Sequence, residues 1–326
     1  MTPKDKNLIT FIDLFAGIGG MRIAFESLGA QCLLTCEIDK NALITYKKNY
    51  KPTHNHIYAE DVINLQSKSI PKHDILIAGF PCQPYSIAGL RKGLKDNRGQ
   101  VFIEIIRILR DLKPKAFLLE NVKGILNHDN GETFKYMTEE LNKIDYEIKV
   151  DILNSMTHAN IPQNRERVFI VGMLDSTSLA KFIFPEKIKL KKTIHDCLDL
   201  KGDSIKPNHI YDERYDCFNI IKKSVLKTDT LYQWRRQYVR ENKSNACPTL
   251  TANMGSGGHN VPLVLDPVLN KIRKLTPKET ANFQGFPPTF KLPSELADSK
   301  LYHQFGNSVT VPLIKRIAKN IIDALK

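Results

Sequence analysis

The sequence predicts a doubly wound α/β fold, in which helices cover both faces of a mainly parallel sheet. Short, β-branched apolar segments alternate with segments of helical periodicity through the N-terminal half of the chain. A glycine-rich turn, Gly17-Ile-Gly-Gly20, joins the first apolar segment to the first helical one. Beyond about residue 186 the alternation stops, so we expect a second, smaller and irregular region there.

The expected elements follow one another in a regular order. An apolar strand over 8–15 leads into a helix over 19–28, and a strand over 31–37 leads into a helix over 39–49. A short buried strand covers 73–79. The series continues with a helix over 101–109, a strand over 116–120, a helix over 131–143 and a strand over 166–172.

Composition changes along the chain suggest how it divides into domains. The stretch 186–271 is rich in Lys, Asp, Asn and turn residues, and helical periodicity returns from about residue 299. We therefore expect a large domain of residues 1–185 plus 300–326, with the last helical segment docked back on it. A smaller domain of residues 186–271 and a hinge of residues 272–299 complete the division.

Composition also excludes several classes of protein. No apolar run reaches the roughly 18 residues that cross a bilayer, and the polar start Met1–Asn7 lacks the apolar core of a signal peptide. We expect a cytoplasmic protein without membrane attachment. The six cysteines are too sparse for a disulfide scaffold and form no Cys-x-x-Cys pair with matching histidines, so we expect no metal site. Cys32 and Cys36 are expected to be free, buried thiols.

The chain is basic, with 48 Lys and Arg against 35 Asp and Glu, a formal net charge of +13. This excess favours a polyanionic partner, of which nucleic acid is the obvious example. On composition alone, a basic protein without such a partner is an equally good interpretation.

Cys82 is the most informative residue of the chain. It follows the expected buried strand in the run Gly79-Phe-Pro-Cys-Gln83, between a proline and a glutamine. A cysteine at the tip of a strand is poorly explained as core filler. We interpret it as a candidate nucleophile on a strand-to-loop turn.

Two further motifs are expected beside this cysteine. Glu120 and Asn121 end the next strand, and carboxyl ends of parallel strands meet at one edge of a sheet. Arg165 and Arg167 precede another strand and, at alternate positions of an extended chain, point the same way. They are either solvated or suited to anionic and carbonyl oxygens near the nucleophile.

The glycine turn suggests a nucleotide-like cofactor. Its glycines allow a tight turn and a close approach to a ligand, although Arg22 stands where the full dinucleotide pattern has glycine. Glu37, about 20 residues further on, is placed to accept ribose hydroxyls. Asp61 is placed to accept from an adenine amino group, and Phe15 to pack on the ring. These residues do not separate NAD from S-adenosylmethionine, and a plain turn with solvated acids stays open.

Six sequence blocks together resemble the DNA (cytosine-5)-methyltransferases of the bacterial type, and they occur in the family's order along nearly the whole chain. The blocks are Asp13-Leu-Phe-Ala-Gly-Ile-Gly-Gly20, Gly79-Phe-Pro-Cys-Gln83, Glu120-Asn-Val122, Gln163-x-Arg-x-Arg167, Arg273-x-Leu-Thr-Pro-x-Glu279 with Gln284-Gly-Phe-Pro287, and Gln304-Phe-Gly-Asn-Ser-Val309. The chain departs from the family at Asn282, where an arginine is usual; that arginine is thought to support packing between the domains.

The resemblance implies a Rossmann-like sheet that binds S-adenosylmethionine and releases S-adenosylhomocysteine. The implied catalytic residues are Cys82, Gln83, Glu120, Asn121, Arg165 and Arg167. The implied cofactor residues are Phe15, Ala16, Gly17, Gly19, Gly20, Glu37, Ile38, Asp61, Val62, Pro81, Asn307, Ser308 and Val309. The implied chemistry is addition of the Cys82 thiolate to carbon 6 of cytosine, with Glu120 at ring nitrogen 3 and Arg167 at the carbonyl oxygen.

The resemblance also implies how DNA is held. The target cytosine is flipped out of the duplex, and the basic, glycine-containing segment 84–98 is expected to close over the DNA as a lid. The segment Pro248–Ala252 resembles the family's target-recognition core, and Gln233–Tyr238 offers donors to base edges, although Trp234 is equally well explained as core. The expected DNA contacts are Ser86, Arg91, Lys92, Arg98, Thr249, Thr251, Asn253 and Gly255.

The function that follows from the resemblance is methylation of a specific sequence in double-stranded DNA. We expect a monomer that protects DNA from a cognate restriction endonuclease without forming a stable complex with it. Three alternatives are a tRNA cytosine-5 methyltransferase, an NAD-dependent enzyme on the same fold and a non-enzymatic DNA-binding module. The NAD alternative leaves Cys82, Glu120 and the arginine pair without a purpose, and the long variable region 186–271 favours a reader of DNA over one of tRNA.

Overall fold

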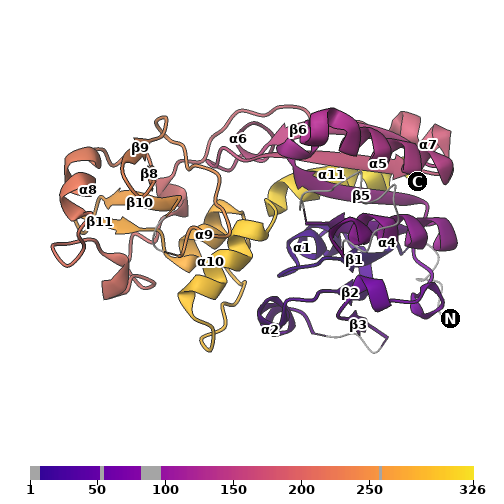
Figure 1. The fold of residues 1–326 in the computed structure, drawn as a ribbon, viewed down its shortest axis with the longest axis horizontal. Helices are drawn as coiled ribbons and strands as arrows, with labels where there is room; N and C mark the ends of the chain where they lie inside the picture. The colour runs from indigo at the N-terminus through magenta and orange to yellow at the C-terminus, as the bar shows by residue number, and fades with distance from the viewer. Residues whose placement is uncertain (1–7, 52–54, 82–96, 257–258) are drawn as a thin grey trace.

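The computed structural model describes residues 8–51, 55–81, 97–256 and 259–326. A large region built on a seven-stranded sheet lies beside a smaller region built on a four-stranded sheet, and helices α9 and α10 lie between them (Figure 1). The carboxyl terminus lies at the end of the large region that faces away from the small one (Figure 1).

The large sheet has the strand order β3-β2-β1-β4-β5-β7-β6. Its first five strands are parallel, whereas β7 runs antiparallel to both β5 and β6. Because the order reverses between β1 and β4, the carboxyl ends of these two strands flank a crevice of the kind that binds ligands in α/β proteins. The strands are β1 (Thr10–Leu14), β2 (Gln31–Cys36), β3 (Ile57–Ala59), β4 (Ile75–Gly79), β5 (Ala116–Val122), β6 (Glu147–Asn154) and β7 (Glu166–Met173).

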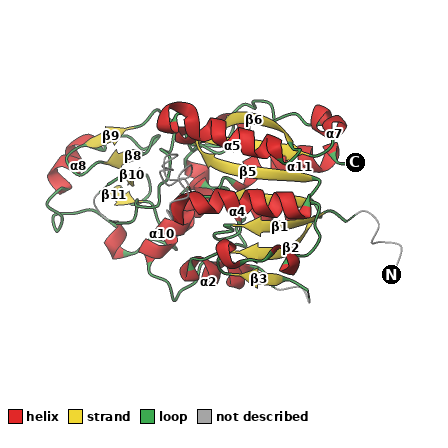
Figure 2. Cartoon of the chain, turned by 45° about the vertical axis from the view of Figure 1, so that its right-hand side comes forward, coloured by secondary structure: helices red, strands yellow, loops and turns green. Residues whose placement is uncertain are grey.

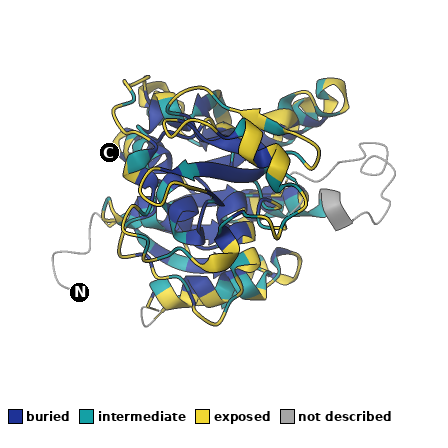
Figure 3. Ribbon diagram, turned by 90° about the vertical axis from the view of Figure 1, so that its left-hand side faces the viewer, coloured by how far each residue is buried: buried dark blue, intermediate teal, exposed yellow. Residues whose placement is uncertain are grey.

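Helices pack on both faces of this sheet because alternate residues of each strand point to opposite sides. In β4, Ile75 and Ile77 pack in one core with α1 and α11, while Leu76 and Ala78 pack in another with α4 and α5. The inner strands of the sheet are therefore buried between two helical layers (Figures 2 and 3). The helices of this region are α1 (Gly20–Glu26), α2 (Lys40–Asn49), α4 (Asn97–Leu112), α5 (Glu132–Lys143), α6 (Ser155–His158), α7 (Ser176–Lys181) and α11 (Val311–Ala324).

The last strand of the predicted series departs from the parallel arrangement of the others. The strand expected over 166–172 exists as β7, but it is antiparallel, because the connection from β6 holds only the one-turn helix α6 and cannot cross over the sheet. Strand β6 was not predicted at all. Its sequence alternates charged with apolar residues, as in Glu147, Lys149 and Asp151, which is typical of an edge strand protected from further pairing.

The small region is more regular than the sequence indicates. Its antiparallel sheet has the order β11-β10-β8-β9 and packs Trp234, Leu263 and Ile272 into a core with Ile221 of helix α8. Trp234 is buried, so of its two interpretations the structure favours core. The elements are α8 (Phe218–Ser224), β8 (Tyr232–Trp234), β9 (Val239–Glu241), β10 (Val261–Asp266) and β11 (Lys271–Lys274). Strand β11 runs across the expected boundary between the small domain and the hinge at residues 271 and 272. The domain division as a whole stays a prediction.

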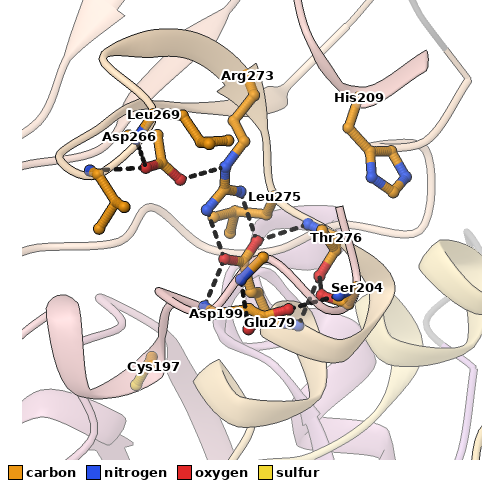
Figure 4. A network of polar contacts seen from close by, with 12 residues as sticks. Cys197, Asp199, Ser204, His209, Asp266, Leu269, Arg273, Leu275, Thr276 and Glu279 are labelled. Carbon is orange, nitrogen blue, oxygen red and sulfur yellow. Dashed lines mark hydrogen bonds and ion pairs between the residues drawn. The ribbon is translucent and has the colours of Figure 1, made fainter. Parts of the chain in front are cut away.

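A buried ionic cluster fastens this small sheet to helix α9 (Pro277–Phe283) (Figure 4). Arg273 of β11 donates through Nε to Asp266 at 2.7 Å and through Nη1 and Nη2 to Glu279 at 2.8 and 2.7 Å. Glu279 also closes a capping box with Thr276 at the start of α9. Phe283 at the end of α9 belongs to the core of the large region, so the helix links both sheets.

No helix in the described part of the chain has both the length and the apolar character to span a membrane. The same residues contain no group of three or more His, Cys, Asp and Glu side chains placed to hold a metal ion. Cys32 and Cys36 are free and buried, as predicted.

Candidate active site

The carboxyl ends of β4 and β5 lie side by side. Gly79 is the register partner of Glu120, and Phe80 and Pro81 continue from Gly79 along the same edge. Cys82 and Gln83 follow directly but lie outside the described residues, so their roles stay predictions. The strand register nevertheless brings the start of the cysteine motif next to the glutamate.

Arg167 reaches the same edge because β7 is antiparallel. Its position opposite Val122 puts the beginning of β7 at the carboxyl end of β5. There the Nε of Arg167 forms an ion pair with Oε1 of Glu120 at 3.0 Å. A residue that precedes a strand would lie at the far end of a parallel sheet, so the reversal of β7 is what assembles this pair.

The Glu120–Arg167 pair leaves the carboxyl group with an unusual proton affinity. Burial raises the pKa of Glu120, and the nearby guanidinium groups of Arg167 and Arg165 only partly offset this, so the pKa stays above its ordinary value. Burial likewise lowers the pKa of Arg167, against the attraction of Glu120. A buried carboxyl of this kind holds a proton more readily than an exposed glutamate and is suited to donate a hydrogen bond.

Asn121 braces the segment that leads to the cysteine. Its Nδ2 donates to the carbonyl oxygen of Phe80 at 3.1 Å, and its Oδ1 accepts from the amide of Val122 at 2.8 Å. The side chain is buried. Asn121 therefore ties the end of β5 to the chain that continues from β4.

Arg165 joins three segments of the chain. Its Nη1 donates to the carbonyl of Leu250 at 2.8 Å, and its Nη2 donates to the carbonyls of Gly306 and Ser308 at 3.1 and 2.5 Å. Its Nε has no partner among the described residues. Arg165 lines the same cavity as Arg167, but its terminal donors hold the main chain, so a direct role at a substrate stays a prediction.

The crevice between β1 and β4 opens into a cavity of about 620 Å³ that also reaches Glu120, Asn121, Arg165 and Arg167. The cavity lies where the strand order reverses, which is where ligands bind in such sheets. The predicted cofactor residues that line it are Phe15, Ala16, Gly17, Gly20, Glu37, Ile38, Pro81, Asn307, Ser308 and Val309.

Three predicted cofactor residues do not line this cavity. Gly19 lies within the glycine turn, where its carbonyl accepts from the hydroxyl of Tyr50. Asp61 accepts from the amide of Ile63 at 3.0 Å and so caps a short 3₁₀ turn, and Val62 is buried in the core. Contacts of these three residues with a cofactor stay predictions.

The carboxylate of Glu37 ties the glycine turn to the segment that precedes α2. One carboxylate oxygen accepts from the amide of Gly17 at 2.7 Å and the other from the amide of Asp39 at 2.7 Å. Burial raises the pKa of Glu37, although these amides counteract it. Phe15, beside the turn, has a φ of 56°, which is uncommon for a residue with a side chain and points to a local requirement at this site.

The segment after α10 (Asp298–Asn307) forms another wall of the cavity. A Cβ on Gly20 would lie 2.9 Å from Oγ of Ser308 and 3.0 Å from Cγ2 of Val309, so glycine permits this close approach. Sequence reasoning did not assign Asp13 and Gln304, which also line the cavity and each carry a buried side-chain atom without a partner among the described residues. Both belong to the sequence blocks of the resemblance, which was the available signal.

The loop that carries Thr249, Thr251, Asn253 and Gly255 packs against α10. Thr249 donates to the carbonyl of Asn164 at 2.6 Å, and Thr251 donates to Oδ1 of Asn253 at 2.7 Å. A Cβ on Gly255 would lie 2.4 Å from the ring of Tyr302, so packing by itself accounts for this glycine. Ala252 of the same loop lines the cavity.

The DNA contacts expected of these four residues stay predictions. Ser86, Arg91 and Lys92 lie outside the described residues, as does most of the expected lid. The end of that segment differs from expectation, because Arg98 belongs to the first turn of α4.

The hairpin between β8 and β9 presents its turn to solvent. Gln233 is buried together with Trp234, and Arg235 donates to Oδ1 of Asn260 at 2.7 Å. The following residues, 236–238, are exposed. Of the predicted donors in Gln233–Tyr238, those in the exposed turn 236–238 are therefore the ones available to a partner.

Asn282, which stands where the family usually has arginine, joins α9 to the segment around Cys197. Its Nδ2 donates to the carbonyl of Cys197 at 3.0 Å. The shorter side chain thus still makes a contact across this junction.

An adenosine-bearing molecule fits the cavity by several criteria. The volume is in the range of small-molecule sites, the glycine turn exposes main chain to it, and the half-buried carboxylate of Glu37 directly follows the neighbouring strand β2. Buried polar atoms without a partner among the described residues, on Asp13 and Gln304, are the kind of group that a bound ligand satisfies.

The sequence as a whole matches the family model described as C-5 cytosine-specific DNA methylase over residues 9–323. Among curated proteins it is 46% identical to the type II methyltransferase M.Bsp6I of Bacillus sp. (strain RFL6), covering 98% of this chain and 100% of the relative. It is 37% identical to the type II methyltransferase M.HhaI of Haemophilus parahaemolyticus, covering 99% and 97%.

Solved structures share the fold at low sequence identity. The Entamoeba histolytica methyltransferase EhMeth superposes with a TM-score of 0.76 at 20% identity, covering 98% of this chain and 100% of that one. The S. pombe Dnmt2 methyltransferase gives a TM-score of 0.75 at 20% identity, with 98% and 99% covered. At this identity the likeness concerns the fold alone.

Proposed function

Because the chain belongs to the C-5 cytosine-specific DNA methylase family, and is a bacterial-type DNA cytosine-5 methyltransferase, we propose that it methylates a flipped-out cytosine through a covalent bond to Cys82. The observation that carries this proposal is the Glu120–Arg167 pair at the strand edge from which the cysteine motif continues. It combines a carboxyl of raised pKa with a cationic donor at one end of a ligand-sized cavity.

The proposed reaction begins with the Cys82 thiolate. Its sulfur lone pair forms a bond to carbon 6 of cytosine, the electrons of the carbon 5–carbon 6 double bond make carbon 5 nucleophilic, and ring nitrogen 3 takes the proton of Glu120. Arg167 donates to the carbonyl oxygen on carbon 2, and its charge together with that of Arg165 favours the thiolate. Once carbon 5 carries the methyl group, it gives its proton to water and ring nitrogen 3 returns its proton to Glu120, while the sulfur leaves as thiolate and the carbon 5–carbon 6 double bond is restored.

S-adenosylmethionine supplies an electrophilic methyl group when it is bound in the cavity. We assign the ribose hydroxyls to Glu37, the adenine face to Phe15 and Ile38, and the remaining contacts to the glycine turn and residues 307–309, which all line the cavity. Asn121 holds Phe80, and with it the segment that precedes Cys82, at the same edge.

The substrate is double-stranded DNA, and its target carbon is inaccessible inside the stacked duplex, so the cytosine must leave the helix. We assign closure over the flipped base to segment 84–98 and sequence reading to the loop around Thr249–Gly255 and the exposed turn 236–238. The net charge of +13 suits the phosphate backbone. The biological role we infer is protection of cytoplasmic DNA, by a monomer, from a restriction endonuclease of the same system.

Bisulfite sequencing of DNA from cells that express the protein tests activity and reveals the target sequence at once. Cys82→Ser is expected to abolish methylation while DNA binding is retained. Cys217→Ser is the matched control, since Cys217 is a free, partly accessible thiol in the small region. Methylation that persists in the Cys82 variant contradicts the covalent mechanism. Methyl transfer to tRNA but not to duplex DNA contradicts the assigned substrate.

A further inference from the structure

Helix α2 and the residue that ends it, Tyr50, make two contacts that the proposed mechanism does not use. The hydroxyl of Tyr50 donates to the carbonyl of Gly19 at 2.6 Å in a buried position. In the middle of the helix, the hydroxyl of Thr45 donates to Oε1 of Gln304 at 2.7 Å, also buried. Gly19 belongs to the glycine turn and Gln304 to the wall contributed by α10. One helix therefore bonds to two of the segments that build the cavity.

The contact between Tyr50 and the glycine turn is tight. Gly19 has a φ of 80°, and a Cβ at this position would lie 2.4 Å from a ring carbon of Tyr50. The Tyr50 ring in turn packs on Tyr46 at 4.4 Å between centroids and under the guanidinium of Arg22 at 4.5 Å. Arg22 also donates to the Tyr46 hydroxyl at 2.9 Å. The Tyr50 ring is therefore restrained by both neighbours, and its hydroxyl fixes the position of the Gly19 carbonyl in the glycine turn.

The contact with Gln304 decides which end of its amide faces the cavity. Because the Thr45 hydroxyl holds the oxygen, the amide nitrogen is left without a partner among the described residues, and Gln304 lines the cavity while being buried. A buried donor without a partner is costly unless a bound molecule supplies an acceptor. Thr45 thus keeps a donor available on the cavity wall.

The helix itself is anchored from outside the cavity. The side chain of Asn49 donates to the carbonyl of Lys291 at 2.9 Å and accepts from its amide at 2.7 Å. At the other end, the amide of Asp39 just before the helix donates to Glu37, which also holds Gly17. Both ends of α2 are therefore fixed relative to the segments that it contacts.

We propose that Tyr50 and Thr45 are positioning residues for the methyl donor. Through Gly19 and Gln304 they hold the glycine turn and the α10 wall at the spacing that S-adenosylmethionine requires, without reaching the reacting atoms themselves. This inference rests on the proposed use of the cavity for that molecule. It assigns to α2 a role in donor affinity that is separate from the chemistry at Cys82 and Glu120.

The test compares Tyr50→Phe and Thr45→Val with the unmodified enzyme in steady-state methyl transfer to duplex DNA and in calorimetric binding of S-adenosylhomocysteine. Each variant loses one hydrogen bond, so we expect the KM for the methyl donor and the Kd for the product to rise about three- to tenfold. The kcat at saturating donor and the KM for DNA are expected to stay unchanged. Thr45→Ser, which keeps the hydroxyl, is expected to restore the original values.

Tyr146→Phe is the matched control for Tyr50. The hydroxyl of Tyr146 donates to the carbonyl of Pro114 at 2.6 Å in an equally buried position, but near the amino end of β5, away from the cavity. This variant should lose stability without a change in KM. If the variants at Tyr50 and Thr45 behave like the control, or lower kcat with KM unchanged, the positioning roles are wrong. If the unmodified protein does not bind S-adenosylhomocysteine, the proposed use of the cavity is wrong instead.

Discussion

Among the described residues, two buried clusters of arginine and carboxylate are built differently. In the small region, Arg273 uses Nε for Asp266 and both terminal nitrogens for Glu279, and all three side chains are at most 1% exposed. At the edge of the large sheet, Glu120 has a single ion pair with Arg167 among the described residues and borders a cavity.

The proton affinities follow this difference. Burial tends to raise the pKa of Asp266, but the amides of Leu269 and Val268 and the guanidinium of Arg273 reverse the effect and leave the pKa below its ordinary value. The guanidinium groups of Arg167 and Arg165 offset the burial of Glu120 only in part, so the pKa of Glu120 stays above its ordinary value. A saturated cluster holds elements together, whereas an incompletely neutralised one beside a cavity has hydrogen-bonding and proton-transfer capacity left for a substrate.

The largest expected effect is on kcat, which should respond to a change at Glu120 but not to the same change at Glu279. Glu120→Gln keeps the shape of the side chain but removes the proton that nitrogen 3 is to receive, so we expect kcat to fall roughly 10²- to 10⁴-fold. Glu279→Gln makes the same chemical change in the saturated cluster and should leave kcat of the folded protein nearly unchanged. Single-turnover methyl transfer with both variants measures the difference, and comparable losses at the two positions would show that the clusters do not differ in function.

The second expected effect is on the free energy of unfolding, which should depend strongly on the saturated cluster around Arg273. Arg273→Met leaves Asp266 and Glu279 as buried carboxylates without their cation, which should cost about 3–5 kcal/mol in the free energy of unfolding. Arg214→Met is the control, because the Arg214–Asp212 pair is largely exposed and its loss should not be detectable. Urea unfolding followed by circular dichroism compares the two variants. If Arg273→Met leaves the protein as stable as Arg214→Met does, the structural role of the cluster is contradicted.

The smallest expected effect is a shift in pH dependence. If Glu120 acts as a proton donor, kcat falls as the pH rises through its pKa. Arg167 lowers that pKa, so Arg167→Gln should move the alkaline limb of kcat to higher pH while reducing the maximum rate. A limb that stays in place would mean that another group sets it.

The same titration affects stability in a definite direction. Because the folded-state pKa of Glu120 is above its ordinary value, the folded protein binds more protons than the unfolded chain between those two values. The contribution of Glu120 to stability is therefore present below its ordinary pKa and is lost as the pH rises through the raised one. Unfolding curves over that window should show a steeper loss in the Arg167→Gln variant than in the unmodified protein.

Much of the site followed from local patterns in the chain. The glycine turn, Glu37 and the strands ending at Gly79 and Glu120 have sequence signals that need only short-range rules, and the cavity is lined by these residues. The short strands of the small sheet carried no such signal, since their stability comes from packing Trp234 and its neighbours against one another. Thr45 was missed for the same reason, because its contact with Gln304 joins distant parts of the chain.

The sequence by itself therefore determined the fold class, the family and the order of the chemical motifs, because periodicity, glycine spacing and motif order are properties of the chain. Only the tertiary structure decided that β7 is antiparallel, which puts Arg167 beside Glu120. It also decided that Arg165 holds three carbonyls and that Gly255 serves packing against Tyr302. These outcomes depend on which distant segments meet in space, and no local pattern encodes that meeting.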